Sequence, residues 1–384
     1  MKVLFFANKM PDLCGAFLHD VDLAIELQRA GHSVVFLTIR VPREGYSGGT
    51  WRGFRFLHHT AGRSFMESSD IWVCPHAPIL PEVRRANSRG FNRPIVATCH
   101  YDGNYTMITG NAENGWSEML MFINNIMESS YKNAIKPWPQ SIARTEVIRP
   151  IMHRDKIVIT EPFAGEYITL INANQNKGVA QFCDIARKMP SRKFLGVIPY
   201  YGELRLPPNL PSNIKWVPFD DDIRNILKQT RILLVPSYYE SYGRVAVEAM
   251  INGIPVLYSK PIKTSIYPGG STEGMCEWIG DAGIACDREV IEEWTQAISS
   301  LDDISMYGSR SQLSRDHIDS LDLFTEAKRI VGLLESFSRQ HPVYRKVETQ
   351  SQQVRDSKEA PRMTNNPQRP VGFGFSNGRL RIQR

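Results

Sequence analysis

The sequence has little that would place the chain in a membrane or in an oxidising compartment. Its start, MKVLFFANKM, contains an apolar run that is too short for a signal-peptide core or a membrane span. Its six cysteines are scattered and form no CxxC pair, which argues against a zinc site and against a disulfide framework. From these absences we expect a cytoplasmic protein with reduced thiols.

Excess charge is scarce outside one segment. The formal net charge is +6, and residues 339–384 hold ten Lys and Arg against three Asp and Glu, so the rest of the chain is close to neutral. This segment is poor in aliphatic residues and rich in Gln, Asn, Pro and Arg, a composition that predicts disorder. With Tyr344, Phe373 and Phe375 among its basic residues, it could bind nucleic acid or an anionic membrane, or remain solvated.

Short apolar runs alternate with helical patterns along most of the chain. KVLFF, FLHDVDLAIELQRAGH and SVVFLTI predict strand, helix and strand within the first forty residues, which is typical of a parallel α/β sheet. A more polar helical zone is expected over residues 114–135, and the alternation restarts after a break near 150–165. We predict two Rossmann-like α/β domains, over 1–155 and 156–320, followed by a helix at 321–338 that packs back toward the first domain.

The most informative stretch is PSYYESYGRVAVEAMINGIPV, residues 236–256. A buried strand, RILLVPS, leads into it, and a helix that Gly253 terminates follows. The amino terminus of a helix favours phosphate, and Gly243 near that terminus lets a diphosphate approach the backbone. Glu240 and Glu248 bracket this point, so we expect them to bind hydroxyl groups on either side of a diphosphate.

This stretch resembles the Glu-x7-Glu signature of the retaining GT-B glycosyltransferases related to glycogen synthases, sucrose synthases and mannosyltransferases. Upstream, INANQNKGVAQFCDIARKM resembles the strand, Lys-Gly and helix of the same family. The resemblance implies two Rossmann-like domains facing each other across a cleft. It also implies transfer of a hexosyl or pentosyl group from a nucleotide diphosphate sugar, with retention of configuration and without a metal or other cofactor.

The resemblance assigns roles to individual residues. Lys177 would neutralise the diphosphate, Glu240 would bind the sugar and Glu248 the ribose, whereas Asn172 stands where the family often has an arginine. In PIVATCHYDGN, His100 follows a strand and would lie near the transferred sugar. The implied catalytic residues are His100, Glu240 and Lys177. The implied donor-binding residues are Asn172, Lys177, Glu240, Tyr242, Gly243, Arg244 and Glu248, and the acceptor side holds Gly15 and Asp102.

Two questions stay open at this level. FDDD at Phe219–Asp222 imitates an Asp-x-Asp metal motif, but it opens a predicted helix, so helix capping explains it better. The acceptor could be a saccharide, a lipid-linked group or a base in nucleic acid, and the oligomeric state is open. A DNA-modifying glycosyltransferase and a GT-B sugar-nucleotide epimerase are therefore alternative functions.

Overall fold

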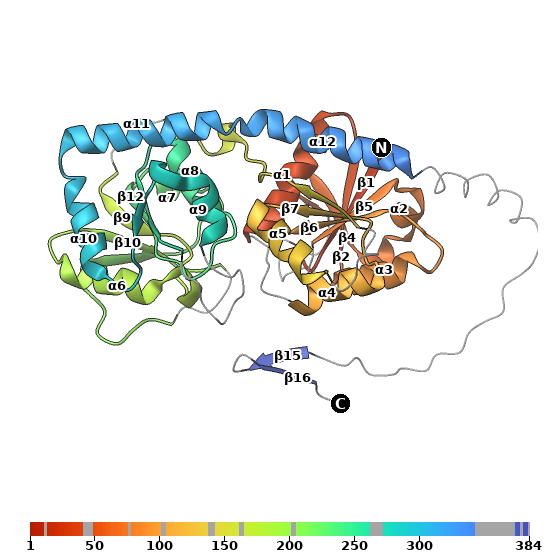
Figure 1. The fold of residues 1–384 in the computed structure, drawn as a ribbon, viewed down its shortest axis with the longest axis horizontal. Coiled ribbons are helices and arrows are strands. Elements are labelled where there is room, and N and C mark those ends of the chain that lie inside the picture. Colours follow the sequence, from red (N-terminus) through yellow and green to blue (C-terminus); the bar gives the residue numbers. More distant parts are fainter. Residues whose placement is uncertain are drawn as a thin grey trace, which may run out of the picture. The chain divides into compact units, whose positions relative to one another are not determined.

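The computed structural model describes residues 1–10, 14–40, 49–75, 78–100, 105–136, 143–160, 165–200, 205–261, 272–341, 373–376 and 379–382. Residues 1–341 form one compact unit, and the segment from Pro342 to Arg384 forms another. The first unit contains two β-sheets, each flanked by helices (Figure 1).

The first sheet has eight strands in the order β3-β4-β2-β1-β5-β6-β7-β8. All neighbouring strands are parallel except β3 and β4. The strands are β1 (Lys2–Ala7), β2 (Ser33–Thr38), β3 (Gly49–Trp51), β4 (Phe54–His58), β5 (Ile71–Pro75), β6 (Ile95–Cys99), β7 (Met119–Phe122) and β8 (Arg144–Val147). The accompanying helices are α1 (Gly15–Arg29), α2 (Arg63–Ser68), α3 (Leu80–Asn87), α4 (Tyr105–Asn114) and α5 (Asn125–Ala134).

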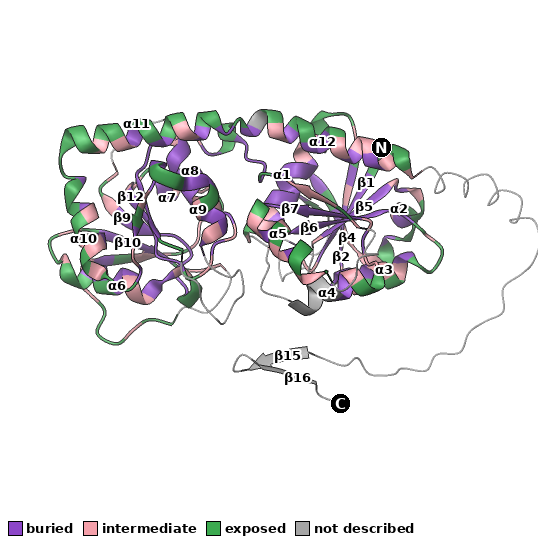
Figure 2. Ribbon diagram, viewed as in Figure 1, coloured by how far each residue is buried: buried purple, intermediate pink, exposed green. Residues whose placement is uncertain are grey.

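The second sheet has six parallel strands in the order β11-β10-β9-β12-β13-β14. The strands are β9 (Tyr167–Leu170), β10 (Phe194–Val197), β11 (Ile214–Val217), β12 (Thr230–Val235), β13 (Val256–Ser259) and β14 (Ile284–Cys286). The accompanying helices are α6 (Val179–Lys188), α7 (Arg224–Leu227), α8 (Arg244–Ile251), α9 (Glu273–Ile279) and α10 (Ile291–Ser300). The inner strands read as continuous apolar runs because helices cover both faces of the sheet (Figure 2).

The prediction of a single helical zone over residues 114–135 is wrong. Met119–Phe122 is strand β7, all four of its residues are buried, and the strand pairs with both β6 and β8. Helix α5 begins only at Asn125, where the side chain of Asn124 accepts a hydrogen bond from Met127 N and caps the helix. A fully buried strand lacks the alternation that would distinguish it from a helix, which explains the error.

The last two helices of the first unit pack on different sheets. Helix α11 (Ile304–Ser320) contacts α8, and helix α12 (Leu323–Gln340) contacts α1. Helix α12 contributes to the core of the first sheet through Ala327, Ile330, Val331, Leu334 and Phe337. None of the helices within the described ranges has both the length and the apolar content needed to cross a membrane.

The carboxyl-terminal segment differs from the disorder expected over 339–384 in two places. Helix α12 extends to Gln340, and β15 (Phe373–Ser376) pairs antiparallel with β16 (Arg379–Ile382). The sequence between these two strands is Asn-Gly, a dipeptide typical of two-residue hairpin turns. The tail prediction overlooked this local signal because it rested on composition. The other residues from 342 onward lie outside the described residues.

Candidate functional site

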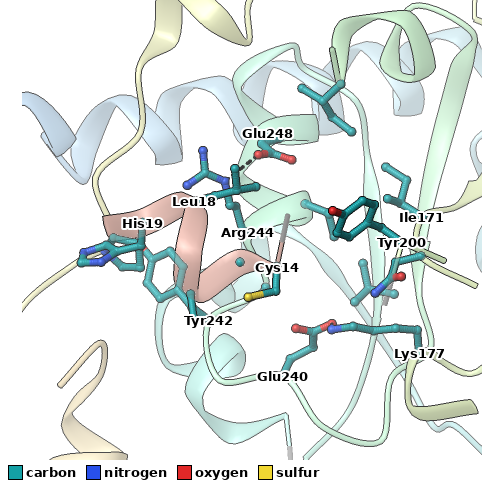
Figure 3. A pocket seen from close by; sticks show the side chains of 18 of the residues that line it. Cys14, Leu18, His19, Ile171, Lys177, Tyr200, Glu240, Tyr242, Arg244 and Glu248 are labelled. Carbon is teal, nitrogen blue, oxygen red and sulfur yellow. Dashed lines mark hydrogen bonds and ion pairs between the residues drawn. The ribbon is translucent and has the colours of Figure 1, made fainter. Parts of the chain in front are cut away.

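One cavity of about 1160 Å³ is lined by residues from both halves of the first unit (Figure 3). Most small-molecule pockets measure roughly 300–1000 Å³, so this cavity is large enough for a nucleotide sugar. It brings together nine residues that the sequence singled out: Gly15, His100, Asn172, Lys177, Glu240, Tyr242, Gly243, Arg244 and Glu248. The tenth, Asp102, lies outside the described residues.

Two loops at the carboxyl ends of β9 and β12 form one wall of the cavity. They touch directly, because the N–H of Tyr238 donates to the carbonyl of Asn176 at 2.9 Å. Gly178 has a left-handed φ of +79°, and a Cβ there would lie 2.1 Å from the carbonyl oxygen of Pro236. Only glycine fits this contact, so the Lys-Gly pair of the sequence holds Lys177 against the loop that carries Glu240.

Lys177 and Glu240 form an ion pair inside this wall. Lys177 Nζ lies 2.5 Å from Glu240 Oε1, and the hydroxyl of Ser237 donates to the same oxygen at 2.9 Å. Glu240 is buried, and Lys177 is partly exposed toward the cavity, as Figure 3 shows. The lysine therefore presents a positive charge whose position the glutamate determines.

The amino terminus of α8 forms the next part of the wall. Gly243 caps this helix with a φ of +77°, and a Cβ there would lie 2.6 Å from the sulfur of Met275. The first N–H groups of a helix have no partner within it and carry partial positive charge. A phosphate at this point would meet the helix terminus with no side chain in between.

Arg244 links the second motif glutamate to the first sheet. Its Nε donates to Glu248 Oε1 at 2.8 Å, and its Nη1 forms an ion pair with Asp22 Oδ2 of α1 at 2.8 Å. All three side chains are at least four-fifths buried. Burial raises the pKa of Glu248, and the nearby Arg244 opposes this shift. Asp22 was not predicted from the sequence.

His153 lies next to Asp22 and extends this group of buried polar side chains. Its Nε2 lies 3.5 Å from Asp22 Oδ1, and its Nδ1 lies 3.3 Å from Glu26 Oε1. Burial lowers the pKa of His153, while the two carboxylates act in the opposite direction. His153 could not be singled out from local sequence, because its partners lie more than 120 positions away.

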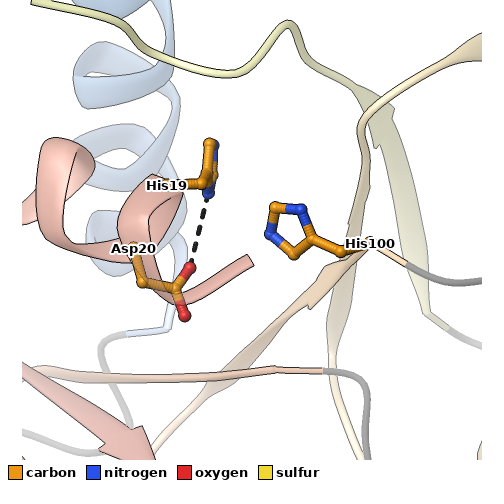
Figure 4. Close-up of side chains that lie close together, drawn as sticks. All are labelled: His19, Asp20 and His100. Carbon is orange, nitrogen blue, oxygen red and sulfur yellow. Dashed lines mark hydrogen bonds and ion pairs between the residues drawn. The ribbon is translucent and has the colours of Figure 1, made fainter. Parts of the chain in front are cut away.

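His19, Asp20 and His100 form a buried cluster on the opposite side of the cavity (Figure 4). His19 Nδ1 lies 3.4 Å from Asp20 Oδ1, and the rings of His19 and His100 meet edge to face at 4.8 Å. The pKa of His100 lies well below its ordinary value, chiefly because burial disfavours the cation and also because of the charges of His19 and Arg244. His100 is therefore neutral near pH 7, and its buried Nε2 has no hydrogen-bond partner among the described residues.

The cluster has three side chains that could each offer one ligand atom to a metal ion. Its potential ligand atoms lie within 4.8 Å of one another, whereas two atoms bound to one metal at about 2.1 Å lie at most about 4.2 Å apart. Direct coordination would therefore require these side chains to move closer together. His19 was missed in the sequence, although it stands four positions after Gly15 and so on the same face of α1.

The remaining predicted residues contribute in different ways. Gly15 is the exposed first residue of α1, and a Cβ there would meet nothing within 4 Å, so packing does not demand glycine. Tyr242 is buried and stacks on Trp278 at 5.3 Å, and burial raises the pKa of its phenol. In FDDD, Asp220 and Asp222 accept hydrogen bonds from nearby backbone N–H groups before α7, as local capping residues do.

Comparisons with known proteins agree with this architecture. The Anabaena protein HepE, solved in complex with UDP and glucose, superposes with a TM-score of 0.68 at 16% identity, covering 88% of this chain and all of that one. Sucrose-phosphate synthase from Thermosynechococcus elongatus superposes with a TM-score of 0.67 at 15% identity, covering 88% of this chain and 98% of that one. The chain has the GT-B fold.

The match to a family model lies in the second half of the chain. Residues 204–301 match the family model described as glycosyl transferases group 1. The D-inositol 3-phosphate glycosyltransferase of Rhodococcus jostii is 30% identical over 132 residues, which is 34% of this chain and 25% of that protein. This chain thus spans about a quarter of the length of the curated relatives it matches. Together with the fold, these findings confirm the resemblance to GT-B glycosyltransferases.

Proposed function

We propose that the chain is a glycosyltransferase that takes a sugar from a nucleotide diphosphate sugar. The observation that carries this proposal is the convergence of Lys177, Glu240 and Glu248 with the amino terminus of α8 on one cavity. HepE, which shares the fold, was solved with UDP and glucose, and residues 204–301, which include both motif glutamates, match the family model of glycosyl transferases group 1. The HepE complex supports a nucleotide sugar as the donor.

The donor diphosphate would bind between Lys177 and the first turn of α8, where a cation and helix N–H groups can stabilise the charge that develops on the leaving group. Glu248 would accept hydrogen bonds from the ribose and Glu240 from the transferred sugar. These cationic groups can take the place of a metal ion, so we propose a reaction that needs none.

The acceptor would enter from the side of α1 and β6, near Gly15 and His100. Asp102, which the resemblance also assigns to the acceptor side, lies outside the described residues. In the proposed step the bond between the anomeric carbon and the phosphate oxygen breaks, and its electron pair stays on the nucleotide diphosphate. The acceptor oxygen forms the new bond on the same face and gives its proton to the leaving phosphate, so configuration is retained. His100, which is neutral near pH 7, can hydrogen-bond a hydroxyl group of the sugar or of the acceptor.

A DNA acceptor is the second candidate. An α-glucosyltransferase solved with UDP and a 13-mer DNA containing an HMU base superposes with a TM-score of 0.62 at 12% identity. The ten basic residues from 339 onward supply charge that could hold a nucleic acid. Salt-dependent DNA binding that disappears when the chain is truncated after Ser338 would favour this acceptor.

The proposal is tested by incubating the purified chain with UDP-, GDP- and ADP-sugars and a panel of acceptors. Lys177→Met and Glu240→Gln should each lower transfer by about a hundredfold or more, because each removes a group that stabilises the transition state. Lys193→Met is the matched control. Lys193 Nζ forms an exposed ion pair with Glu166 Oε2 at 2.6 Å, and this pair does not line the cavity. Full transfer by both cavity variants would contradict the proposal. An epimer formed from the donor alone would indicate an epimerase instead.

A further inference from the structure

Asn172 has a conformation that the fold alone does not explain. It follows β9 at the carboxyl end of an inner strand, lines the cavity, and has a left-handed φ of +60°. Asparagine tolerates this region better than most residues, but it is still an uncommon backbone conformation. Such conformations gather where a site requires them.

The side-chain amide of Asn172 is buried without a hydrogen bond to compensate for its loss of contact with water. The residue is 9% exposed, and neither its amide nitrogen nor its amide oxygen has a hydrogen-bond partner among the described residues. Buried polar groups are nearly always paired, because water no longer satisfies them. Exchanging the nitrogen and oxygen of the amide would not help, since both atoms lack a partner. The amide is therefore arranged to meet a ligand in the cavity.

The kind of ligand group follows from hydrogen-bond chemistry. A phosphate at neutral pH mainly offers acceptor oxygens, so it could satisfy the amide N–H groups but would leave the amide oxygen unpaired. A hydroxyl group accepts one hydrogen bond and donates another, so a single hydroxyl can satisfy both ends of the amide. An arginine, which the family resemblance implies at this position, could only donate hydrogen bonds.

We propose that Asn172 recognises a hydroxyl group of the bound nucleotide sugar. This inference rests on the proposed function, since it requires a sugar nucleotide in the cavity. The hydroxyl is either one of the transferred sugar or the 2′-hydroxyl of the ribose. In this arrangement Lys177 and the amino terminus of α8 bind the diphosphate, and position 172 contributes no positive charge to it.

The test compares Asn172→Gly with Asn209→Gly in the full chain. Glycine adopts the left-handed backbone freely, so the first change removes the amide without forcing the backbone to move. Asn209 is the matched control, because it has a φ of +59° but is exposed and lies outside the lining of the cavity. The probes are UDP-glucose, UDP and 2′-deoxy-UDP, measured by calorimetry, with the matching GDP and ADP compounds if the wild type prefers another base.

Asn172→Gly should weaken UDP-glucose binding by about tenfold, the effect of losing one to two hydrogen bonds. If UDP binds unchanged, the hydroxyl is on the transferred sugar; if UDP also weakens while 2′-deoxy-UDP does not, it is the ribose 2′-hydroxyl. Without ligand, Asn172→Gly should melt at a higher temperature than the wild type, because an unsatisfied buried amide is gone. Asn209→Gly should change neither the affinity nor the response to ligand.

Two results would overturn the inference. Unchanged binding of every probe would show that the amide meets no ligand, and equal weakening of all three probes would assign it to the phosphates. These outcomes differ from failure of the proposed function, in which the wild type itself binds none of the UDP, GDP or ADP sugars.

Discussion

Replacing Arg244 with methionine should destabilise the protein strongly, because this arginine is shared by two buried carboxylates. The side chains of Asp22 and Glu248 are 6% and 8% exposed, and each lies 2.8 Å from the guanidinium. Removing one partner of a buried ion pair costs about 3–5 kcal/mol of unfolding free energy. For a domain of this size, that corresponds to a melting temperature lower by roughly 6–10 °C.

The loss should depend on pH in a defined direction. Burial already raises the pKa of Glu248, and without the arginine this pKa rises further above its unfolded value. A carboxyl group with a raised folded pKa adds stability below its unfolded pKa, and this contribution is lost as pH rises through the folded pKa. The difference in melting temperature between Arg244→Met and the wild type should therefore be large at pH 7.5 and smaller at pH 5.

The assay is thermal unfolding followed by circular dichroism at both pH values. Arg154→Met is the control, because Arg154 pairs with Asp319 and both side chains are more than half exposed. An exposed pair contributes about 0–1 kcal/mol, so this variant should melt close to the wild type at each pH. If Arg244→Met shifts the melting temperature no more than Arg154→Met, or by the same amount at both pH values, the reasoning about the buried charges is refuted.

Two further predictions concern the cavity wall and the histidine cluster. Gly178→Ala should lower the free energy of unfolding by more than the about 1–2 kcal/mol expected for a left-handed backbone, because its Cβ would lie 2.1 Å from the carbonyl oxygen of Pro236. The same change should reduce sugar transfer. Gly31→Ala is the control, because Gly31 has a φ of +83° and a Cβ there would meet nothing within 4 Å, so this variant should lose only the stability that the backbone conformation costs. Equal unfolding midpoints for the two variants would show that the contact with Pro236 has no effect on stability. The third variant is His100→Gln. As pH falls from 7.5 to 5, the wild type should lose stability, because the pKa of the buried His100 is lowered and the unfolded chain binds the proton at a higher pH than the folded protein does. His100→Gln lacks this imidazole, so its stability should fall less over the same range. Melting curves that fall in parallel over that range would show that His100 is not buried as a neutral group.

The second half of the site could be predicted from the sequence because its residues lie close together in the chain. Glu240, Gly243 and Glu248 belong to one loop and one helix, and the apolar run before them indicates the strand that places them. Parallel strands direct their carboxyl ends to the same edge of a sheet, which also places Lys177 there.

The contribution of α1 was harder to foresee. His19 and Asp22 lie on the helix face that begins at Gly15, so helical periodicity could have pointed to them once Gly15 was taken as part of the site. The pairing of Asp22 with Arg244 joins helices α1 and α8, which accompany different sheets, and no local pattern encodes such a contact. The hydrogen-bond state of Asn172 likewise depends on the surrounding packing and is visible only in three dimensions.

The path of the chain through the two sheets bears on how the protein reaches this structure during synthesis. The second sheet is formed entirely by residues between β8 and α12, so it is an insertion within the first domain. The last component of the first core, including Ile330, Leu334 and Phe337, leaves the ribosome only after the whole inserted domain. Until then the face of α1 that α12 covers remains exposed to solvent, and the inserted domain can complete its own core first. The first domain to begin synthesis is thus the last to complete its core, and a nascent chain that stops before α12 leaves that apolar face uncovered.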